Sequence, residues 1–270
     1  MLVDTHSHLN FNAFKDDANE VIRRSLDGST GSPQVWIINV GSQYSTSKRA
    51  VEIAEKYPAG VFAAVGLHPI HVSLEDFEPA KYKELIRNNK VAAIGEIGLD
   101  YKAEYILFKE KQKEVFRDQL KLAEESNLPV IFHCRMAHDD LIKEIRSRNE
   151  IGSPKITGVI HCFTGTWEQA KKYLEFGFYL GFNGIIFKLN LDEIIKKTPL
   201  ERILIETDCP YLTPPPASLR ERSEALRAGP IRNEPIFVKY VVQKIAELKG
   251  ETFEKVAKIT TQNAKELFRI

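Results

Sequence analysis

Short apolar segments rich in Val, Ile and Phe alternate with longer charged segments along the whole chain. Eight such apolar segments occur, at 2–6, 34–41, 61–68, 91–99, 129–134, 157–163, 178–184 and 202–208. Because they are apolar at nearly every position rather than at every second one, they are typical of strands buried on both faces of a parallel sheet. The pattern therefore predicts eight buried parallel strands.

Each of the first seven segments is followed by a stretch with the period of a helix that buries one face. Helices are predicted at 18–26, 45–57, 79–88, 108–126, 139–148, 166–177 and 191–198, and two more at 236–250 and 252–268. Gly177 stands at the end of the sixth helix, where a left-handed C-cap belongs.

The 270 residues give about 34 residues per strand and helix, in line with the length of a βαβ unit. No low-complexity linker divides the chain, so we expect one domain over residues 1–270. The economical architecture is a (β/α)8 TIM barrel. A doubly wound open sheet is the alternative, because the same alternation of strand and helix also builds that fold.

The net charge of +1 provides no broad basic surface for long nucleic acid, so any recognition of phosphate must be local. The longest apolar stretches are too short to span a bilayer, and the N-terminal segment lacks the features of a signal peptide. Three cysteines are too few for a disulfide framework. We therefore expect a soluble, cytoplasmic protein without membrane contact, and no obligate protein partner is indicated.

Ionisable side chains stand at the C-terminal ends of five predicted strands. They are His6, His8, Glu96, His133, His161 and Asp208. In a parallel barrel these strand ends meet on one face, which is the face where active sites lie. Four imidazoles and two carboxylates from distant parts of the chain are therefore predicted to converge.

Six ligands exceed the four that close a structural zinc site, and they suit two divalent cations that share a carboxylate. We assign one ion to His6, His8 and Asp208 and the other to His133 and His161, with Glu96 as the bridge. Mg²⁺, Mn²⁺ and Zn²⁺ all remain compatible with this ligand set. A cation pair of this kind activates a water and neutralises charge on a phosphoryl group, and Asp208 is also placed to act as a general base.

Alternation along a strand makes predictions about the neighbours of these ligands. Asp4 and Glu206 each stand two residues before a ligand, so both are expected to point inward and accept hydrogen bonds from ligand histidines. Cys134, Cys162 and Cys209 each follow a ligand directly. They are expected to point outward as small apolar packing residues rather than to act as ligands or nucleophiles.

A set of motifs then becomes recognisable, in the order VDTHSHLN, GLHP, GEIGLDY, HCR, HCFTG, ETDCPYLTP and RNEP. Over nearly the whole chain this set resembles the TatD-type metal-dependent deoxyribonucleases, which belong to the amidohydrolase-like hydrolases. The resemblance implies a (β/α)8 barrel, two divalent metals and phosphodiester hydrolysis, with the six ligands named above. Members of this family are typically exonucleases on DNA, some also on RNA, in repair or turnover.

Further positions are candidates for contact with the substrate phosphate. His68 ends the third predicted strand, and both the resemblance and its position suggest that it contacts the scissile phosphate. Arg135 offers a guanidinium group beside His133. Arg232 and Asn233 precede the helix that follows the eighth strand, a region where barrels often bind phosphate, and Asn183 is a weaker candidate.

Other features are assigned no catalytic role. His71 and His138 are expected to be exposed to solvent. The segment 216–232 is longer than the family pattern and adds Arg220, Arg222 and Arg227, so it is interpreted as either a wall beside the active site or a solvated insertion.

The predicted function is hydrolysis of phosphodiester bonds at short or single-stranded ends of DNA through a metal-activated water, with RNA left open as a second substrate. One alternative is a hydrolase of the same fold that attacks a carbon centre in a cyclic amide, a lactone or a misacylated-tRNA ester. Relatives that act on cyclic amides often bridge their metals with a carboxylated lysine, whereas Glu96 holds that position here. A second alternative is a scaffold that binds metal without catalysis.

Overall fold

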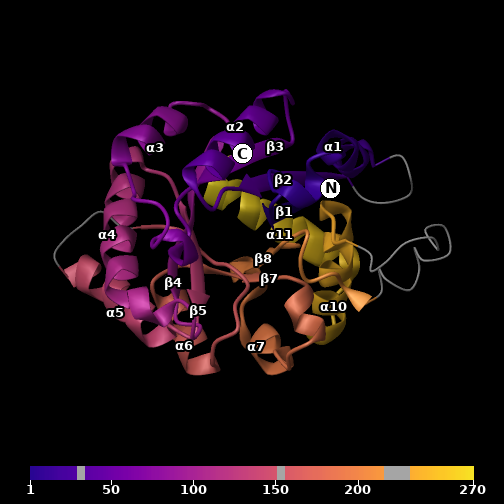
Figure 1. Cartoon of the computed structure of the whole chain (residues 1–270). Coiled ribbons are helices and arrows are strands. Elements are labelled where there is room, and N and C mark those ends of the chain that lie inside the picture. The colour runs from indigo at the N-terminus through magenta and orange to yellow at the C-terminus, as the bar shows by residue number, and fades with distance from the viewer. Residues whose placement is uncertain (29–33, 151–155, 216–231) are drawn as a thin grey trace.

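The computed structural model describes residues 1–28, 34–150, 156–215 and 232–270. Eight parallel strands form one sheet in sequence order, with helices around the outside (Figure 1). The strands are β1 (Leu2–Ser7), β2 (Val35–Val40), β3 (Val61–Val65), β4 (Val91–Asp100), β5 (Val130–Arg135), β6 (Gly158–Ile160), β7 (Tyr179–Phe182) and β8 (Ile203–Ile205). Each predicted strand is therefore confirmed.

The sheet closes on itself where β8 meets β1. Ser7 forms a parallel bridge with Cys209, and the backbone N–H of His8 donates to the Cys209 carbonyl at 2.9 Å. The N–H of Asp208 donates to the carbonyl of His6 at 2.8 Å. These contacts make the fold a barrel, so the alternative of an open, doubly wound sheet is wrong.

Helices follow the strands as the sequence predicts. They are α1 (Ala18–Asp27), α2 (Tyr44–Glu55), α3 (Pro79–Ile86), α4 (Lys109–Ser126), α5 (His138–Glu150), α6 (Trp167–Glu175), α7 (Asp192–Lys197), α10 (Val238–Lys249) and α11 (Phe253–Phe268). Gly177 has a φ of +86° after α6, which confirms the predicted left-handed cap. Among the described residues, no helix has the length and apolar character needed to cross a membrane.

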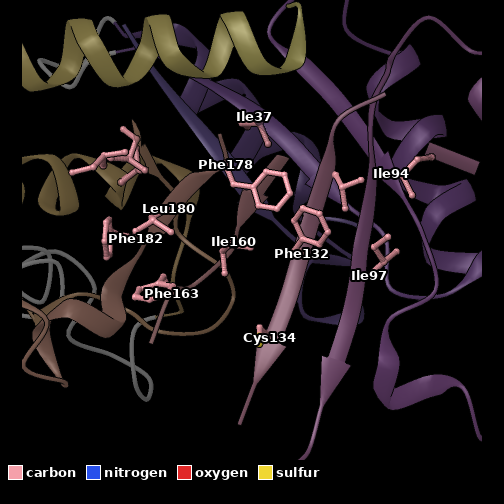
Figure 2. Packing of buried hydrophobic residues seen from close by; sticks show 14 of the residues in the cluster. Ile37, Ile94, Ile97, Phe132, Cys134, Ile160, Phe163, Phe178, Leu180 and Phe182 are labelled. Atoms are coloured by element: carbon pink, nitrogen blue, oxygen red, sulfur yellow. The ribbon is translucent and has the colours of Figure 1, made fainter. Parts of the chain in front are cut away.

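The main core lies between the strands and the surrounding helices. Figure 2 shows part of this layer, with Ile37, Ile94, Phe132 and Leu180 among its buried side chains. A smaller core fills the barrel and takes at least one side chain from every strand, together with Leu267 and others from α11. The strands are therefore buried on both faces, which explains their continuous apolar sequences.

Helix α11 covers the end of the barrel where the strands begin. Asn263 on α11 donates to the carbonyls of Leu200 and Ile203, which lie at the start of β8. Thr261 donates to the carbonyl of Met1, just before β1. This end of the barrel is thus filled by apolar packing, and the ionisable side chains gather at the opposite end.

Candidate metal centre

The barrel brings together all six side chains that the sequence marks as ligands. From β1 and the end of β8, the Nε2 atoms of His6 and His8 lie 3.1 Å apart, and Oδ1 of Asp208 lies 3.4 Å from Nε2 of His8. Nδ1 of His8 donates to the Val40 carbonyl at 2.9 Å. Neutral His8 therefore presents an unprotonated Nε2 to the other two side chains.

Glu96 occupies the middle of the cluster. Its Oε2 lies 3.4 Å from Nε2 of His6, while its Oε1 lies 2.7 Å from Nδ1 of His133 and 3.9 Å from Nε2 of His161. The two oxygens of one buried carboxylate thus face the ligands of β1 on one side and those of β5 and β6 on the other. This is the arrangement that a bridging carboxylate requires.

The donor set fits divalent cations. Within the part of the chain that the structure describes, three groups of side chains have ligand atoms within 4.8 Å of one another. They are His6 with His8 and Asp208, His6 with Glu96 and His161, and His68 with Glu96 and His133. Imidazole nitrogens and carboxylate oxygens are ligands for Zn²⁺ and Mn²⁺, and Nε2 lone pairs directed at one another need a cation or a proton between them. Buried polar atoms without such a partner are costly.

Two carboxylates orient the ligand histidines from behind. Oε2 of Glu206 accepts a hydrogen bond from Nδ1 of His161 at 2.9 Å, as the sequence predicts. Oδ2 of Asp100 lies 3.0 Å from Nε2 of His133 and leaves Nδ1 of that ring facing Glu96. Asp100 was not predicted to have this role. It stands four residues after Glu96 on the same strand, and that even spacing is the signal that identifies it.

The predicted role of Asp4 is wrong. Its carboxylate accepts hydrogen bonds from the backbone N–H and the hydroxyl of Thr207, at 2.8 and 2.6 Å, and from the backbone N–H of His6, not from a histidine ring. Asp4 pairs with Ile37 of β2, and the next pair is Ser7 with Asn39. Between these pairs β1 advances by three residues while β2 advances by two. This bulge breaks the alternation on which the prediction rested.

Charge interactions within the cluster shift the pKa values of its members. Burial opposes protonation of His161, but the carboxylates of Glu206 and Glu96 raise its pKa to about 10. Burial also opposes protonation of His133, but the carboxylates of Glu96 and Asp100 raise its pKa to about 9. Burial alone would raise the pKa of Glu96, yet the imidazoles of His68 and His6 hold it well below its usual range. Carboxylates and histidines are thus paired as charges, and cations that bind here compete with protons.

His68 lies at the edge of the same cluster. Its Nε2 is 3.5 Å from Oε1 of Glu96, and its Nδ1 accepts a hydrogen bond from the N–H of Ile70 at 3.2 Å. Because Nδ1 is an acceptor, neutral His68 carries its proton on Nε2 and presents a hydrogen-bond donor to the cluster. Burial lowers its pKa to about 4, which keeps the ring neutral at neutral pH.

Arg135, the last residue of β5, has an exposed side chain two residues after His133. Arg232 is placed differently. It pairs with Asp17 and Glu234, and its guanidinium lies 4.0 Å from the centre of the Phe14 ring. The structure therefore gives Arg232 a structural role in joining the first loop of the barrel to the segment before α10.

The two candidate asparagines hold loops. Asn233 donates to the carbonyls of Thr207 and Tyr211 and so fixes the segment that carries Asp208. Oδ1 of Asn183 accepts the N–H of Ile185 at the start of a short 3-10 helix. Both side chains are fully buried.

The predictions for the other histidines and the cysteines have mixed outcomes. His138 is buried between the rings of Phe163 and Tyr173, so the expectation of solvent exposure is wrong. Cys134 and Cys209 pack in the outer core, as predicted. Cys162 is only partly buried, with its Sγ 3.5 Å from Oδ1 of Asn183. Residues 216–231, including Arg220, Arg222 and Arg227, lie outside the described residues.

Unusual backbone conformations also mark the site. Six described residues other than glycine have positive φ, and two of them, Asn127 and Arg269, are ordinary helix caps. The other four are Met136, Cys162, Asp208 and Leu212. All four stand at or within four residues of a candidate ligand, and such conformations concentrate at functional sites because the surrounding structure must stabilise them.

A closed (β/α)8 barrel with imidazoles and carboxylates gathered where its strands end is the architecture of a metal-dependent hydrolase. The model of the TatD related DNase family matches residues 3–269. The chain belongs to this family.

Similar proteins agree with this membership. The chain is 43% identical to YabD of Bacillus subtilis (strain 168), described as an uncharacterized metal-dependent hydrolase, over all of both chains. It is 35% identical to the 3'-5' ssDNA/RNA exonuclease TatD of Pantoea vagans (strain C9-1), again over all of both chains. The crystal structure of YJJV, a TatD homologue from Escherichia coli K12, superposes with a TM-score of 0.84 at 28% identity, covering 100% of this chain and 98% of that one.

Proposed function

We propose that the protein is a divalent-metal-dependent exonuclease that hydrolyses phosphodiester bonds in single-stranded DNA or RNA from the 3' end. Family membership gives the nuclease class. The substrate and polarity follow the relative from Pantoea vagans, whose name specifies a 3'-5' ssDNA/RNA exonuclease. The observation that carries the proposal is the position of Glu96, with one oxygen facing His6 and the other facing His133.

We assign two cations to this site. His6, His8 and Asp208 would hold one of them, and His133 and His161 the other, with Glu96 available to both. When bound, the cations activate a water and neutralise charge on the phosphoryl oxygens. A bridging Glu, rather than a carboxylated lysine, favours phosphodiester hydrolysis over attack on a carbon centre.

Asp208 acts as the general base. Its side chain and that of His133 are each 17% exposed, more than the 0% of His6 and the 5% of His8, Glu96 and His161. Asp208 therefore lies on the solvent side of the cluster, where its carboxylate reaches an incoming water. Burial opposes ionisation, but the nearby imidazoles of His8, His161 and His6 lower the pKa of Asp208, so its carboxylate is ionised and able to accept a proton at neutral pH.

His68 and Arg135 bind the phosphate. The Nε2–H of neutral His68 is directed into the cluster and donates to a phosphoryl oxygen, so His68 serves as a substrate contact rather than as a ligand for a third cation. The exposed guanidinium of Arg135 offers two further donors from the end of β5. Both groups stabilise charge that develops on the phosphoryl oxygens as the bond to the leaving nucleotide breaks.

The proposal is tested with single-stranded oligonucleotides labelled at either end, as DNA and as RNA, after treatment with chelator and addition of Mg²⁺, Mn²⁺ or Zn²⁺. We expect a 3' label to be released as a mononucleotide at once, and a 5' label to give a descending ladder. Hydrolysis that persists in chelator would contradict the metal requirement, and internal fragments without a ladder would contradict the exonuclease assignment.

A carbon-centre hydrolase is the other function that the fold permits. The discriminating experiment offers a cyclic amide, a lactone and an aminoacyl ester to the same metal-loaded protein. Turnover of one of these, with no release of nucleotides, would replace the nuclease assignment.

A further inference from the structure

Exposed apolar side chains of the described residues gather on the catalytic face. Eight large apolar side chains of the described residues are exposed, and all except Met1 lie in the segments that follow the C-terminal ends of strands. They are Leu74 after β3, Ile106, Leu107 and Phe108 after β4, Met136 after β5, Leu189 after β7 and Tyr211 after β8. We call these seven residues the apolar rim. Such a one-sided distribution marks a binding surface, because isolated exposed apolar residues scatter over all faces.

Two members of the apolar rim stand three residues after a candidate ligand in the chain. The backbone N–H of Tyr211 donates to the carbonyl of Asp208 at 2.9 Å, and the tyrosine is 55% exposed. Met136 stands three residues after His133 and is 74% exposed. It adopts a φ of +56°, an unfavourable conformation for a methionine. Both residues therefore stand in exposed segments that directly follow a candidate ligand.

The chemistry of the centre determines what contacts this surface. A phosphodiester that reaches the cluster brings its flanking nucleotides over the loops around it. Unpaired bases expose apolar faces that stack on aromatic and apolar side chains, whereas bases in a duplex do not. The net charge of +1 leaves little general attraction for a polyanion. A surface that contacts bases rather than phosphates fits these conditions.

We propose that the apolar rim binds the unpaired nucleobases of the substrate, with Tyr211 and Met136, which follow the ligands Asp208 and His133 in the chain, as its principal contacts. This inference rests on the proposed nuclease function and adds the means by which the strand is held. Stacking is tolerant of base identity, and it does not release counterions. Binding should therefore depend on the presence of bases, vary little among them, and weaken only slightly with added salt.

The experiment measures competition during hydrolysis of a labelled single-stranded oligonucleotide. One competitor is an unlabelled oligonucleotide, and the other has the same length and backbone but no bases. For the wild-type protein we expect the competitor without bases to bind about ten-fold more weakly. For Tyr211→Ala and Met136→Ala this difference should shrink, while Tyr211→Phe should keep it.

Lys188→Ala provides the matched control. Lys188 is exposed beside Leu189 in the loop after β7, and it carries charge but no stacking surface. Its loss should leave the difference between the two competitors as it is in the wild-type protein. Thermal unfolding of each variant separates a damaged fold from a lost contact.

Each other outcome contradicts the proposal. Equal competition with and without bases would show that the backbone alone is recognised. If Tyr211→Ala weakened the binding of both competitors equally, Tyr211 would have a structural role instead. A dimer in light scattering that is lost in Leu107→Ala and Tyr211→Ala would assign the surface to a second copy of the chain.

Failure of the nuclease assignment is distinguishable from failure of this inference. If the metal-loaded protein releases no nucleotides, fluorescence anisotropy still reports whether it binds the two oligonucleotides. Base-dependent binding without hydrolysis would keep the apolar rim and remove the nuclease function. Hydrolysis without base dependence would keep the nuclease function and remove the role proposed for the apolar rim.

Discussion

Oδ2 of Asp100 lies 3.0 Å from Nε2 of His133, and this contact turns the other nitrogen of the ring toward Glu96. A ligand histidine that is fixed from behind loses little freedom when a cation binds. We therefore predict that Asp100→Ala weakens cation affinity by about 10- to 100-fold, because partners of ligand histidines typically have effects of this size. Competition with a chromogenic chelator measures the change.

The control is Asp118→Ala, which removes an exposed carboxylate from α4. Its cation affinity should match that of the wild-type protein. An unchanged affinity in Asp100→Ala would mean that the His133 ring is already fixed by its packing.

Asp4 is predicted to act on stability rather than on metal binding. It joins β1 to the end of β8 through two hydrogen bonds from Thr207, and both donors lose their acceptor in Asp4→Ala. Unpaired buried donors cost about 1–3 kcal/mol, so the free energy of unfolding should fall by about 2 kcal/mol. Urea denaturation of the metal-free protein measures this change. Asp4→Asn keeps an acceptor and should lose less stability. Wild-type stability with weakened cation binding in Asp4→Ala would instead support a role for Asp4 as the partner of a ligand histidine.

The contrast between Asp4 and Glu206 shows what the sequence can and cannot reveal here. Residue type and position at strand ends were sufficient to identify the six candidate ligands, because all parallel strand ends meet on one face. Alternation also placed Glu206 correctly. It failed for Asp4 because the bulge between Asp4 and Ser7 depends on pairing with β2, which no local pattern encodes.

Long-range packing accounts for other differences. His138 follows a strand end in a charged segment, and only the tertiary fold places it between Phe163 and Tyr173. Arg232 looked available for phosphate because its partners, Asp17 and Glu234, include a residue more than 200 positions away in the sequence. Charge pairs of this kind are invisible before the fold is known.

His138 should make stability depend on pH. Burial lowers its pKa from 6.5 to about 4, so the unfolded chain binds a proton between these values that the folded protein does not bind. The free energy of unfolding should therefore fall as pH decreases from 6.5 to 4, with His138 contributing roughly 3 kcal/mol. Urea denaturation across this range should show a shallower decline for His138→Gln. The same decline in the free energy of unfolding with pH for the two proteins would contradict the prediction.

Cation binding should release protons. In the metal-free protein the pKa values of His161 and His133 are raised to about 10 and about 9, so both rings are protonated at neutral pH and must lose their protons to act as ligands. Affinity should rise with pH up to about 10, by as much as about ten-fold per pH unit for each proton displaced, and the rise should become less steep above about pH 9, where His133 has already lost its proton. Isothermal titration calorimetry at pH 7 in two buffers of different ionisation enthalpy counts the protons. The same heat in both buffers would contradict this prediction.

Loss of His68 should affect catalysis but not metal binding, because its Nε2 carries a proton. We predict that His68→Ala lowers kcat by about 10²- to 10³-fold, the range found when a donor to a developing negative charge is removed. Its cation affinity should equal that of the wild-type protein. A fall in bound cations per chain would instead make His68 a ligand.

The central claim is that six side chains from five regions of the barrel hold a pair of cations across Glu96. Equilibrium dialysis against Mn²⁺ at pH 8, with the bound metal measured per chain, tests it most directly. The account predicts two ions for the wild-type protein and at most one for Glu96→Ala. One ion in the wild-type protein, or two in Glu96→Ala, would contradict it.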